Sequence, residues 1–286
     1  MVSARTYYRL TKPGIVYGNV FHAAVGVLLA HASGLTLLWS GGGLILGITA
    51  VIASACVANN IMDRRIDSKM ARTKKRAMVI GQIETPSAVL FALVLLTVGV
   101  TVLVRTTNFL TVILCLVAYI WYVWIYGWAK RTTWWSTVIG TVPGAIPIMA
   151  GYTAVTNHLD ASAWLLFAML VLWQLPHFFA IALYREKEYR AAKLPIISVS
   201  LGRHQTWRQM AVYGTLYVLS LVGLVIAQTF ALIPGLIILA AGAYWLVIIF
   251  RGRTHVSDTW ARHVFRLSLL LTIVLFVASS ITVVIS

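Results

Sequence analysis

The feature that most constrains this chain is a succession of apolar stretches separated by short segments that carry most of its charge. Each stretch is about 20 residues long, the length a helix needs to cross the hydrocarbon core of a bilayer. Charged residues make up 10% of the 286 positions, against roughly one quarter in soluble domains. The sequence therefore predicts an all-α, polytopic membrane protein. The net charge of +16 does not indicate a nucleic acid partner, because the basic residues are confined to the connections between apolar stretches.

Nine such stretches predict nine transmembrane helices in a single intramembrane domain covering residues 1–286. Every Arg and Lys except Arg105 lies in the N-terminal segment or in and beside alternate connections. Because basic residues concentrate in cytoplasmic loops, we expect a cytoplasmic N-terminus and a C-terminus on the opposite side. The expected location is the bacterial inner membrane, which makes the C-terminus periplasmic. The predicted limits of the spans are 13–32, 41–62, 86–104, 107–127, 134–153, 161–183, 208–228, 231–250 and 265–285.

The segment 59–76, NNIMDRRIDSKMARTKKR, places an amide and two carboxylates at the cytoplasmic mouth of the second span. Asn59, Asp63 and Asp67 stand four residues apart, so on a helix they share one face. No basic residue lies three or four positions from Asp63, and two like charges at this spacing repel each other. This pattern favours a bound cation over the alternative of a solvated helix end with ordinary ion pairs.

The chemistry of the same segment indicates which cation and which ligand. Hard oxygen donors suit Mg²⁺, which is commonly held by one or two carboxylates together with substrate phosphates. The basic residues that follow, Lys69, Arg72 and Arg76 among them, suit a diphosphate. Their position at the membrane surface predicts a diphosphate whose other end is lipid.

These residues also resemble a family signature. The pattern resembles that of the UbiA-type intramembrane prenyltransferases, and the resemblance implies a bundle of nine transmembrane helices. It also implies that Asn59, Asp63 and Asp67 coordinate Mg²⁺ on an isoprenyl diphosphate. The matching positions are Asn59-x3-Asp63-x2-Ile66-Asp67-x2-Met70-x-Arg72-Thr73-x2-Arg76-x4-Gly81.

A second cluster, Tyr126-x3-Lys130, closes the fourth span. By itself it could be an interfacial Tyr with a snorkelling cation. The family carries a Tyr and a Lys here that hold the diphosphate, and the resemblance implies that role for both residues. The fifth span contains Gly140, Pro143, Gly144 and Pro147, which are compatible either with the wall of a pocket or with a packing kink.

The second acidic region, residues 173–195, contains Tyr184 and Glu188 four positions apart at the cytoplasmic end of the sixth span. It lacks the three Asp residues of family members that act on quinone precursors. The sequence Pro176-His177-Phe178 instead resembles the haem branch, the protohaem IX farnesyltransferases, although Lys193 and residues 196–198 depart from that branch.

The haem-branch resemblance implies transfer of a farnesyl group from farnesyl diphosphate to a vinyl group of haem B, giving haem O for a terminal oxidase. It implies that Glu188 assists the metal site and Tyr184 the diphosphate, while His177 ligates or orients haem. The alternatives are a hydrogen-bonded packing role for His177, an aromatic acceptor such as 4-hydroxybenzoate, and a membrane transporter. A transporter would place its acids deep in broken helices, whereas these lie at helix ends.

Overall fold

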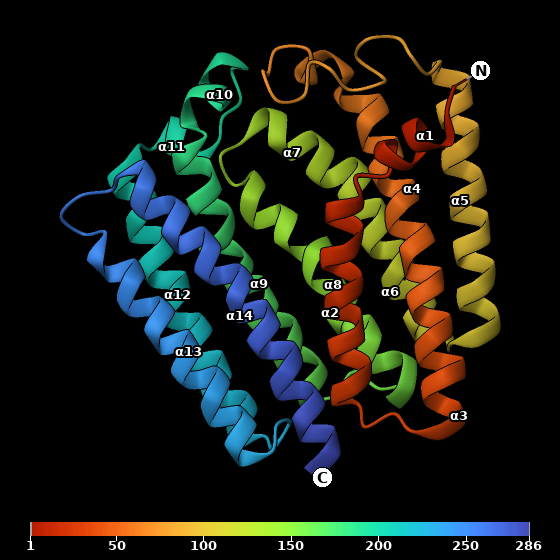
Figure 1. Ribbon diagram of the computed structural model, residues 1–286, viewed down its shortest axis with the longest axis vertical. Helices are drawn as coiled ribbons and strands as arrows, with labels where there is room; N and C mark the ends of the chain where they lie inside the picture. Colours follow the sequence, from red (N-terminus) through yellow and green to blue (C-terminus); the bar gives the residue numbers. More distant parts are fainter. Residues whose placement is uncertain (1, 286) are drawn as a thin grey trace.

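A computed structural model describes residues 2–285 as a bundle of helices, with no strand in that range (Figure 1). Within this range, eight helices are long and apolar enough to cross a membrane, and α2 is a ninth, shorter apolar helix. The nine spans are α2 (Pro13–Leu29), α3–η1–α4 (Gly34–Thr36, Leu37–Gly41, Gly42–Asp67), α5 (Thr85–Thr106), α6–η2–α7 (Phe109–Ile120, Trp121–Ile125, Tyr126–Thr132), α8 (Ser136–Thr156), α9 (Ala161–Tyr184), α12 (Arg203–Ile226), α13 (Leu232–Arg251) and α14 (Asp258–Ile285). The predicted all-α membrane fold is confirmed.

Successive spans run in opposite directions, so the connections gather at two ends of the bundle. Three short helices lie at the end that holds the N-terminus, and the C-terminus lies at the other end (Figure 1). Asp67 ends α4 and Tyr184 ends α9 at this N-terminal end. The two acidic regions of the sequence therefore face the same side of the membrane. The short helices are α1 (Ala4–Leu10), α10 (Glu186–Ala191) and α11 (Ile197–Ser200).

Several helices extend beyond the predicted limits at this end. The second span continues to Asp67 rather than residue 62, the seventh begins at Arg203 rather than 208, and the ninth at Asp258 rather than 265. The predictions followed the apolar residues, whereas backbone hydrogen bonds continue through charged turns that lie outside the hydrocarbon. One prediction is wrong in kind. Tyr184 and Glu188 do not share a helix, because α9 ends at Tyr184 and α10 begins at Glu186.

Helices α2 and α8 approach each other through two glycines. A Cβ atom on Gly26 would lie 2.0 Å from the carbonyl oxygen of Ile148, and one on Gly151 would lie 2.0 Å from that of Ala23. Small residues allow such close backbone packing where a bilayer provides no hydrophobic force between helices. This contact fixes the positions of two helices that line the cavity described below.

Candidate active site

Asn59, Asp63 and Asp67 are buried on one face of α4, with 2%, 7% and 5% of their surfaces exposed. The helix is continuous from Gly42 to Asp67, so the predicted shared face is confirmed. A buried carboxylate is costly unless it is paired and hydrogen-bonded. The partners of these side chains therefore define the local chemistry.

The partners of both carboxylates come from other parts of the chain. Lys130 Nζ donates to Asp63 Oδ2 at 2.5 Å, and Arg131 Nη2 donates to Asp63 Oδ1 at 3.1 Å. Arg76 Nη1 donates to Asp67 Oδ2 at 2.6 Å. A bound cation is therefore not needed to explain how the two Asp residues are tolerated, and its presence stays a prediction. Basic side chains distant in sequence neutralise them, and Arg131 was missed as one of these.

Lys12 is a further member of this cluster that the sequence did not indicate. Its Nζ donates to Asn59 Oδ1 at 2.5 Å, and its backbone has a left-handed φ of 53° just before Pro13. Burial lowers the pKa of this ammonium from 10.5 to about 8. Its only sequence signal was a cation immediately before the first span.

The loop after α4 folds back over the cluster and positions Arg76. The Thr73 hydroxyl donates to the Asp67 carbonyl at 2.9 Å, and Arg76 Nη1 also donates to Asn60 Oδ1 at 3.3 Å. Lys69 and Arg72, the other two predicted diphosphate ligands of this loop, are exposed. Neither makes a hydrogen bond or an ion pair within residues 2–285. The structure thus joins Arg76, but not Lys69 or Arg72, to the carboxylates.

The second acidic region contributes less than the spacing suggested. Glu188 pairs with Arg185 at 3.6 Å, and its Oε2 is buried with no hydrogen-bond partner among residues 2–285. Tyr184 lies under Arg262, 4.9 Å from the guanidinium carbon to the ring centroid. Over the described part of the chain, no three His, Cys, Asp or Glu side chains come together as a metal site. Glu188 is therefore not gathered with Asp63 and Asp67 into one acidic group.

Tyr189 connects this region with the loop after α4. Burial raises the pKa of its hydroxyl, while the nearby charges of Arg72 and Arg185 lower it. Arg72 is thus close enough to act electrostatically on a residue of α10. The two loops face each other across the cytoplasmic end predicted from the sequence.

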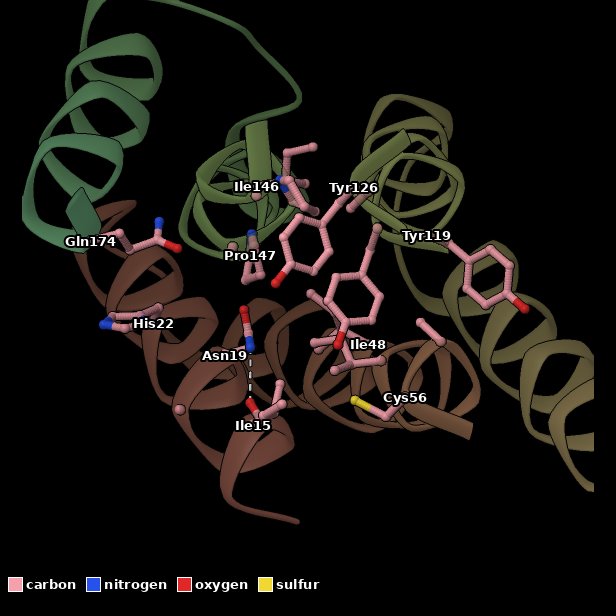
Figure 2. A pocket seen from close by; sticks show the side chains of 18 of the residues that line it. Ile15, Asn19, His22, Ile48, Cys56, Tyr119, Tyr126, Ile146, Pro147 and Gln174 are labelled. Carbon is pink, nitrogen blue, oxygen red and sulfur yellow. Dashed lines mark hydrogen bonds between the residues drawn. The ribbon is translucent and has the colours of Figure 1, made fainter. Parts of the chain in front are cut away.

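Beneath the acidic cluster lies a largely apolar cavity of about 390 Å³. Figure 2 shows Asn19 of α2, Tyr126 of α7 and Gln174 of α9 around it. Cys56 of α4 lines the cavity, and Asn59 follows it by less than one helical turn. Tyr126 also lines it, and Lys130, which holds Asp63, follows Tyr126 by one turn. The charged cluster therefore adjoins the cavity along both helices.

Aromatic and small residues shape the cavity wall. The π-helical turn η2 brings Tyr122 and Tyr126 into a stack with ring centroids 5.6 Å apart, and Lys130 Nζ lies 5.4 Å from the Tyr126 ring centroid. Helix α8 stays helical through its two prolines. The glycines and prolines of α8 named above all line the cavity: Gly140, Pro143, Gly144 and Pro147. Their position favours a role in the pocket wall over a simple packing kink.

His177 lines the same cavity from α9. Its Nδ1 lies 2.6 Å from Ser268 Oγ of α14, and its ring stacks on Trp173 with centroids 4.8 Å apart. His177 and Tyr184 both contact Phe265, with centroid distances of 4.9 and 5.9 Å, so they share a face of α9. Tyr184 lies nearer the charged end, and His177 lies two turns deeper.

Known proteins match this chain almost throughout. Residues 19–281 match the UbiA prenyltransferase family. The chain belongs to this family. It is 38% identical to a protein from Aliivibrio salmonicida named protoheme IX farnesyltransferase, over 93% of this chain and 92% of that one. A protein of the same name from Protochlamydia amoebophila is also 38% identical, over 94% and 95% of the two chains.

Solved structures share the fold at low sequence identity. One, described in work on digeranylgeranylglyceryl phosphate synthase in membranes, has a TM-score of 0.82 at 14% identity and covers 100% of both chains. A UbiA homologue from Archaeoglobus fulgidus bound to GPP and Mg²⁺ has a TM-score of 0.70 at 16% identity, covering 96% of this chain and 99% of that one. The protein is thus a prenyltransferase with a multi-pass membrane fold.

Proposed function

We propose that this prenyltransferase transfers the farnesyl group of farnesyl diphosphate to a vinyl group of haem B, giving haem O. Relatives bearing the matching name support this substrate pair. The main observation behind this proposal is one cavity whose two ends differ in polarity. Charged residues surround Asp63 and Asp67 at its mouth, whereas His177 lines its apolar interior. A neutral imidazole is a natural ligand for haem iron.

The donor set at the mouth fits Mg²⁺. Asn59, Asp63 and Asp67 offer oxygen atoms on one face, and the buried Glu188 Oε2 has no hydrogen-bond partner in the part of the chain that the structure describes. Two carboxylates and an amide are fewer ligands than a complete protein cage, which suits an ion that retains waters and substrate phosphates. When bound, Mg²⁺ would neutralise charge on the departing diphosphate. Glu188 would assist from α10, as the resemblance to the haem branch implies.

The basic side chains of the cluster would hold the diphosphate itself. Lys130, Arg76 and Lys12 each lie within hydrogen-bond distance of a side chain proposed to hold the metal. The phosphate oxygens would accept hydrogen bonds from these three groups, which stabilises the leaving group. The family resemblance would add Arg72, Lys69, Tyr126 and Tyr184 to this set.

The reaction then needs little from the protein besides electrostatic stabilisation and the exclusion of water. The C–O bond to farnesyl breaks, and its electron pair leaves with the diphosphate. The outer vinyl carbon of haem B attacks the allylic cation, and water adds to the inner carbon with loss of a proton. The faces of Tyr122 and Tyr126 would stabilise the allylic cation, and the apolar wall would keep water from reaching it first.

The acceptor is tested with purified protein in lipid nanodiscs supplied with Mg²⁺ and farnesyl diphosphate. Haem B and 4-hydroxybenzoate are offered separately, and the products are identified by mass. We expect a farnesylated, hydrated haem and no farnesylated benzoate. Prenylation of the benzoate alone would overturn the haem assignment, and absence of any transfer with movement of a solute across vesicles would favour a transporter.

We further propose that the charged end faces the cytoplasm of a bacterial inner membrane, with the C-terminus in the periplasm. Basic residues surround that end, as the positive-inside rule requires. Haem O would then be released to a terminal oxidase in the same membrane. Labelling of single cysteines introduced at Lys74 and Ser257 on one side, and at Thr107 and Asn157 on the other, tests the orientation. Labelling of the second pair from the cytoplasm would contradict it.

A further inference from the structure

The hydroxyl of Ser268 is shared between its own helix and the imidazole of His177. Ser268 Oγ donates to the carbonyl oxygen of Phe265 at 2.6 Å and lies 2.6 Å from His177 Nδ1. Ser268 is fully buried, with none of its surface exposed. Its position on α14 therefore links His177 in the cavity wall to a second helix, whose next residue, Leu269, also lines the cavity.

A hydroxyl has one proton, and this fixes the direction of the second hydrogen bond. Because the proton of Ser268 goes to the Phe265 carbonyl, its oxygen must accept from Nδ1–H of His177. A neutral imidazole with its proton on Nδ1 carries a lone pair on Nε2. The nitrogen left for a ligand in the cavity is therefore in the form that binds iron.

A second contact to Ser268 holds the plane of the same ring. Trp173 Nε1 donates to the carbonyl oxygen of Ser268 at 3.2 Å, and the Trp173 and His177 rings are stacked within 22° of parallel. The main chain of Ser268 thus anchors the stacking partner, while its side chain anchors the imidazole. The two roles can be separated, because replacement of the side chain leaves the carbonyl in place.

We infer that Ser268 is a positioning residue for the acceptor, which sets the tautomer and direction of His177 toward haem iron. This rests on the proposed function, in which haem is the acceptor. Groups that orient a metal-ligating imidazole through its other nitrogen commonly change metal affinity by about 10- to 100-fold when removed. In this arrangement Ser268 orients the imidazole, and His177 ligates the haem iron.

The test compares Ser268→Ala with Ser279→Ala, a matched control on the same helix. Ser279 is equally buried and donates only to the carbonyl of Leu275, at 2.7 Å. Both variants are titrated with haem B, and the Soret spectrum of the bound haem is recorded. We expect Ser268→Ala to bind haem about tenfold or more weakly with a shifted Soret band. Ser279→Ala should match the wild type, and farnesyl diphosphate affinity should be unchanged in both.

The outcomes separate this inference from the proposed function. Wild-type protein that binds no haem contradicts the haem assignment itself. Haem bound by the wild type, with the same affinity and spectrum in Ser268→Ala, overturns the role of Ser268. If Ser268→Ala yields little folded protein, Ser268→Thr and Ser268→Cys replace it, since threonine keeps an oxygen acceptor and cysteine does not. Recovery of the wild-type spectrum by threonine alone supports the inference, and identical spectra in both contradict it.

Discussion

Lys130 Nζ donates to Asp63 Oδ2 at 2.5 Å, although 67 positions separate the two residues in the chain. A residue proposed to hold phosphate thus neutralises one proposed to hold the metal. A magnesium diphosphate contains both a cation and an anion. The Mg²⁺ can therefore replace Lys130 as the partner of Asp63, and the diphosphate can replace Asp63 as the partner of Lys130. The cluster can therefore accept its substrate without leaving a buried charge unpaired.

Removal of either carboxylate charge is expected to abolish most turnover. Asp63→Asn and Asp67→Asn keep the side-chain shape but lose the negative charge that would hold the metal. We predict a decrease in kcat on the order of 10²-fold or more for each variant, since preorganised charge is a large contribution to such catalysis. The measurement is haem O formation with saturating substrates.

Glu84→Ala serves as the control for these variants. Glu84 is an exposed carboxylate before α5, at the same end of the bundle, and its side chain makes no capping hydrogen bond. It should retain wild-type activity. Near-normal turnover in both Asp variants, at equal amounts of folded protein, would remove Asp63 and Asp67 from the metal site.

The sequence predicted the fold better than it predicted the residues at which individual helices begin and end. Spans were recognisable because apolar residues must cover the hydrocarbon width, and because every Arg and Lys except Arg105 lies in the N-terminal segment or in and beside alternate connections. The extension of α4 to Asp67 and of α14 back to Asp258 lay in charged turns. Apolar periodicity carries no information about such turns.

The site was predictable where its residues share one helix and not where they meet across the bundle. The common face of Asn59, Asp63 and Asp67 followed from spacing alone. The pairing of Lys12 with Asn59, and of Arg131 with Asp63, depends on contacts between residues 47 and 68 positions apart. Ser268 is likewise 91 positions from His177, and nothing near it in the sequence marks it.

Activity should require a divalent cation. Excess chelator is expected to reduce haem O formation to background, and added Mg²⁺ should restore it, because the oxygen donors of α4 suit this ion. Turnover of farnesyl diphosphate is measured from the amount of diphosphate released. Full turnover in excess chelator would mean that Lys12, Arg76 and Lys130 alone carry the leaving group.

Lys12 predicts a dependence on pH. Because the pKa of its ammonium is about 8, its charge is lost as pH rises through that value. We expect the KM for farnesyl diphosphate to rise by about tenfold between neutral and alkaline pH, which corresponds to one charge-assisted hydrogen bond. The rise in KM is not explained by unfolding caused by the titration of Lys12. Because the pKa of Lys12 is lower in the folded state than in the unfolded state, its titration increases the free energy of unfolding as pH rises from about 8 to 10.5.

Lys12→Arg separates this effect from other titrations. Arginine stays charged throughout this range, so the variant should keep a flat KM between neutral and alkaline pH. Both proteins are measured at constant free Mg²⁺. An identical rise in the wild type and in Lys12→Arg would assign the titration to another group.

The glycine contact between α2 and α8 should limit stability. Gly151→Ala places a methyl group 2.0 Å from the Ala23 carbonyl, so the helices must separate. Overpacking of this kind costs about 1–3 kcal/mol, which should lower the thermal midpoint measured by fluorescence-detected size exclusion. Gly42→Ala is the control, since no atom lies within 4 Å of its added Cβ. Equal midpoints for the two variants would contradict the close packing.

In the proposed reaction, one cavity holds the diphosphate at its charged mouth and haem at His177. The most direct measurement titrates haem B absorbance and farnesyl diphosphate binding separately on His177→Ala and Asp63→Asn. We expect His177→Ala to weaken haem binding by about tenfold or more and to leave diphosphate binding near that of the wild type. Asp63→Asn should show the reverse pattern. Loss of both ligands in both variants, or unchanged haem affinity in His177→Ala, would contradict it.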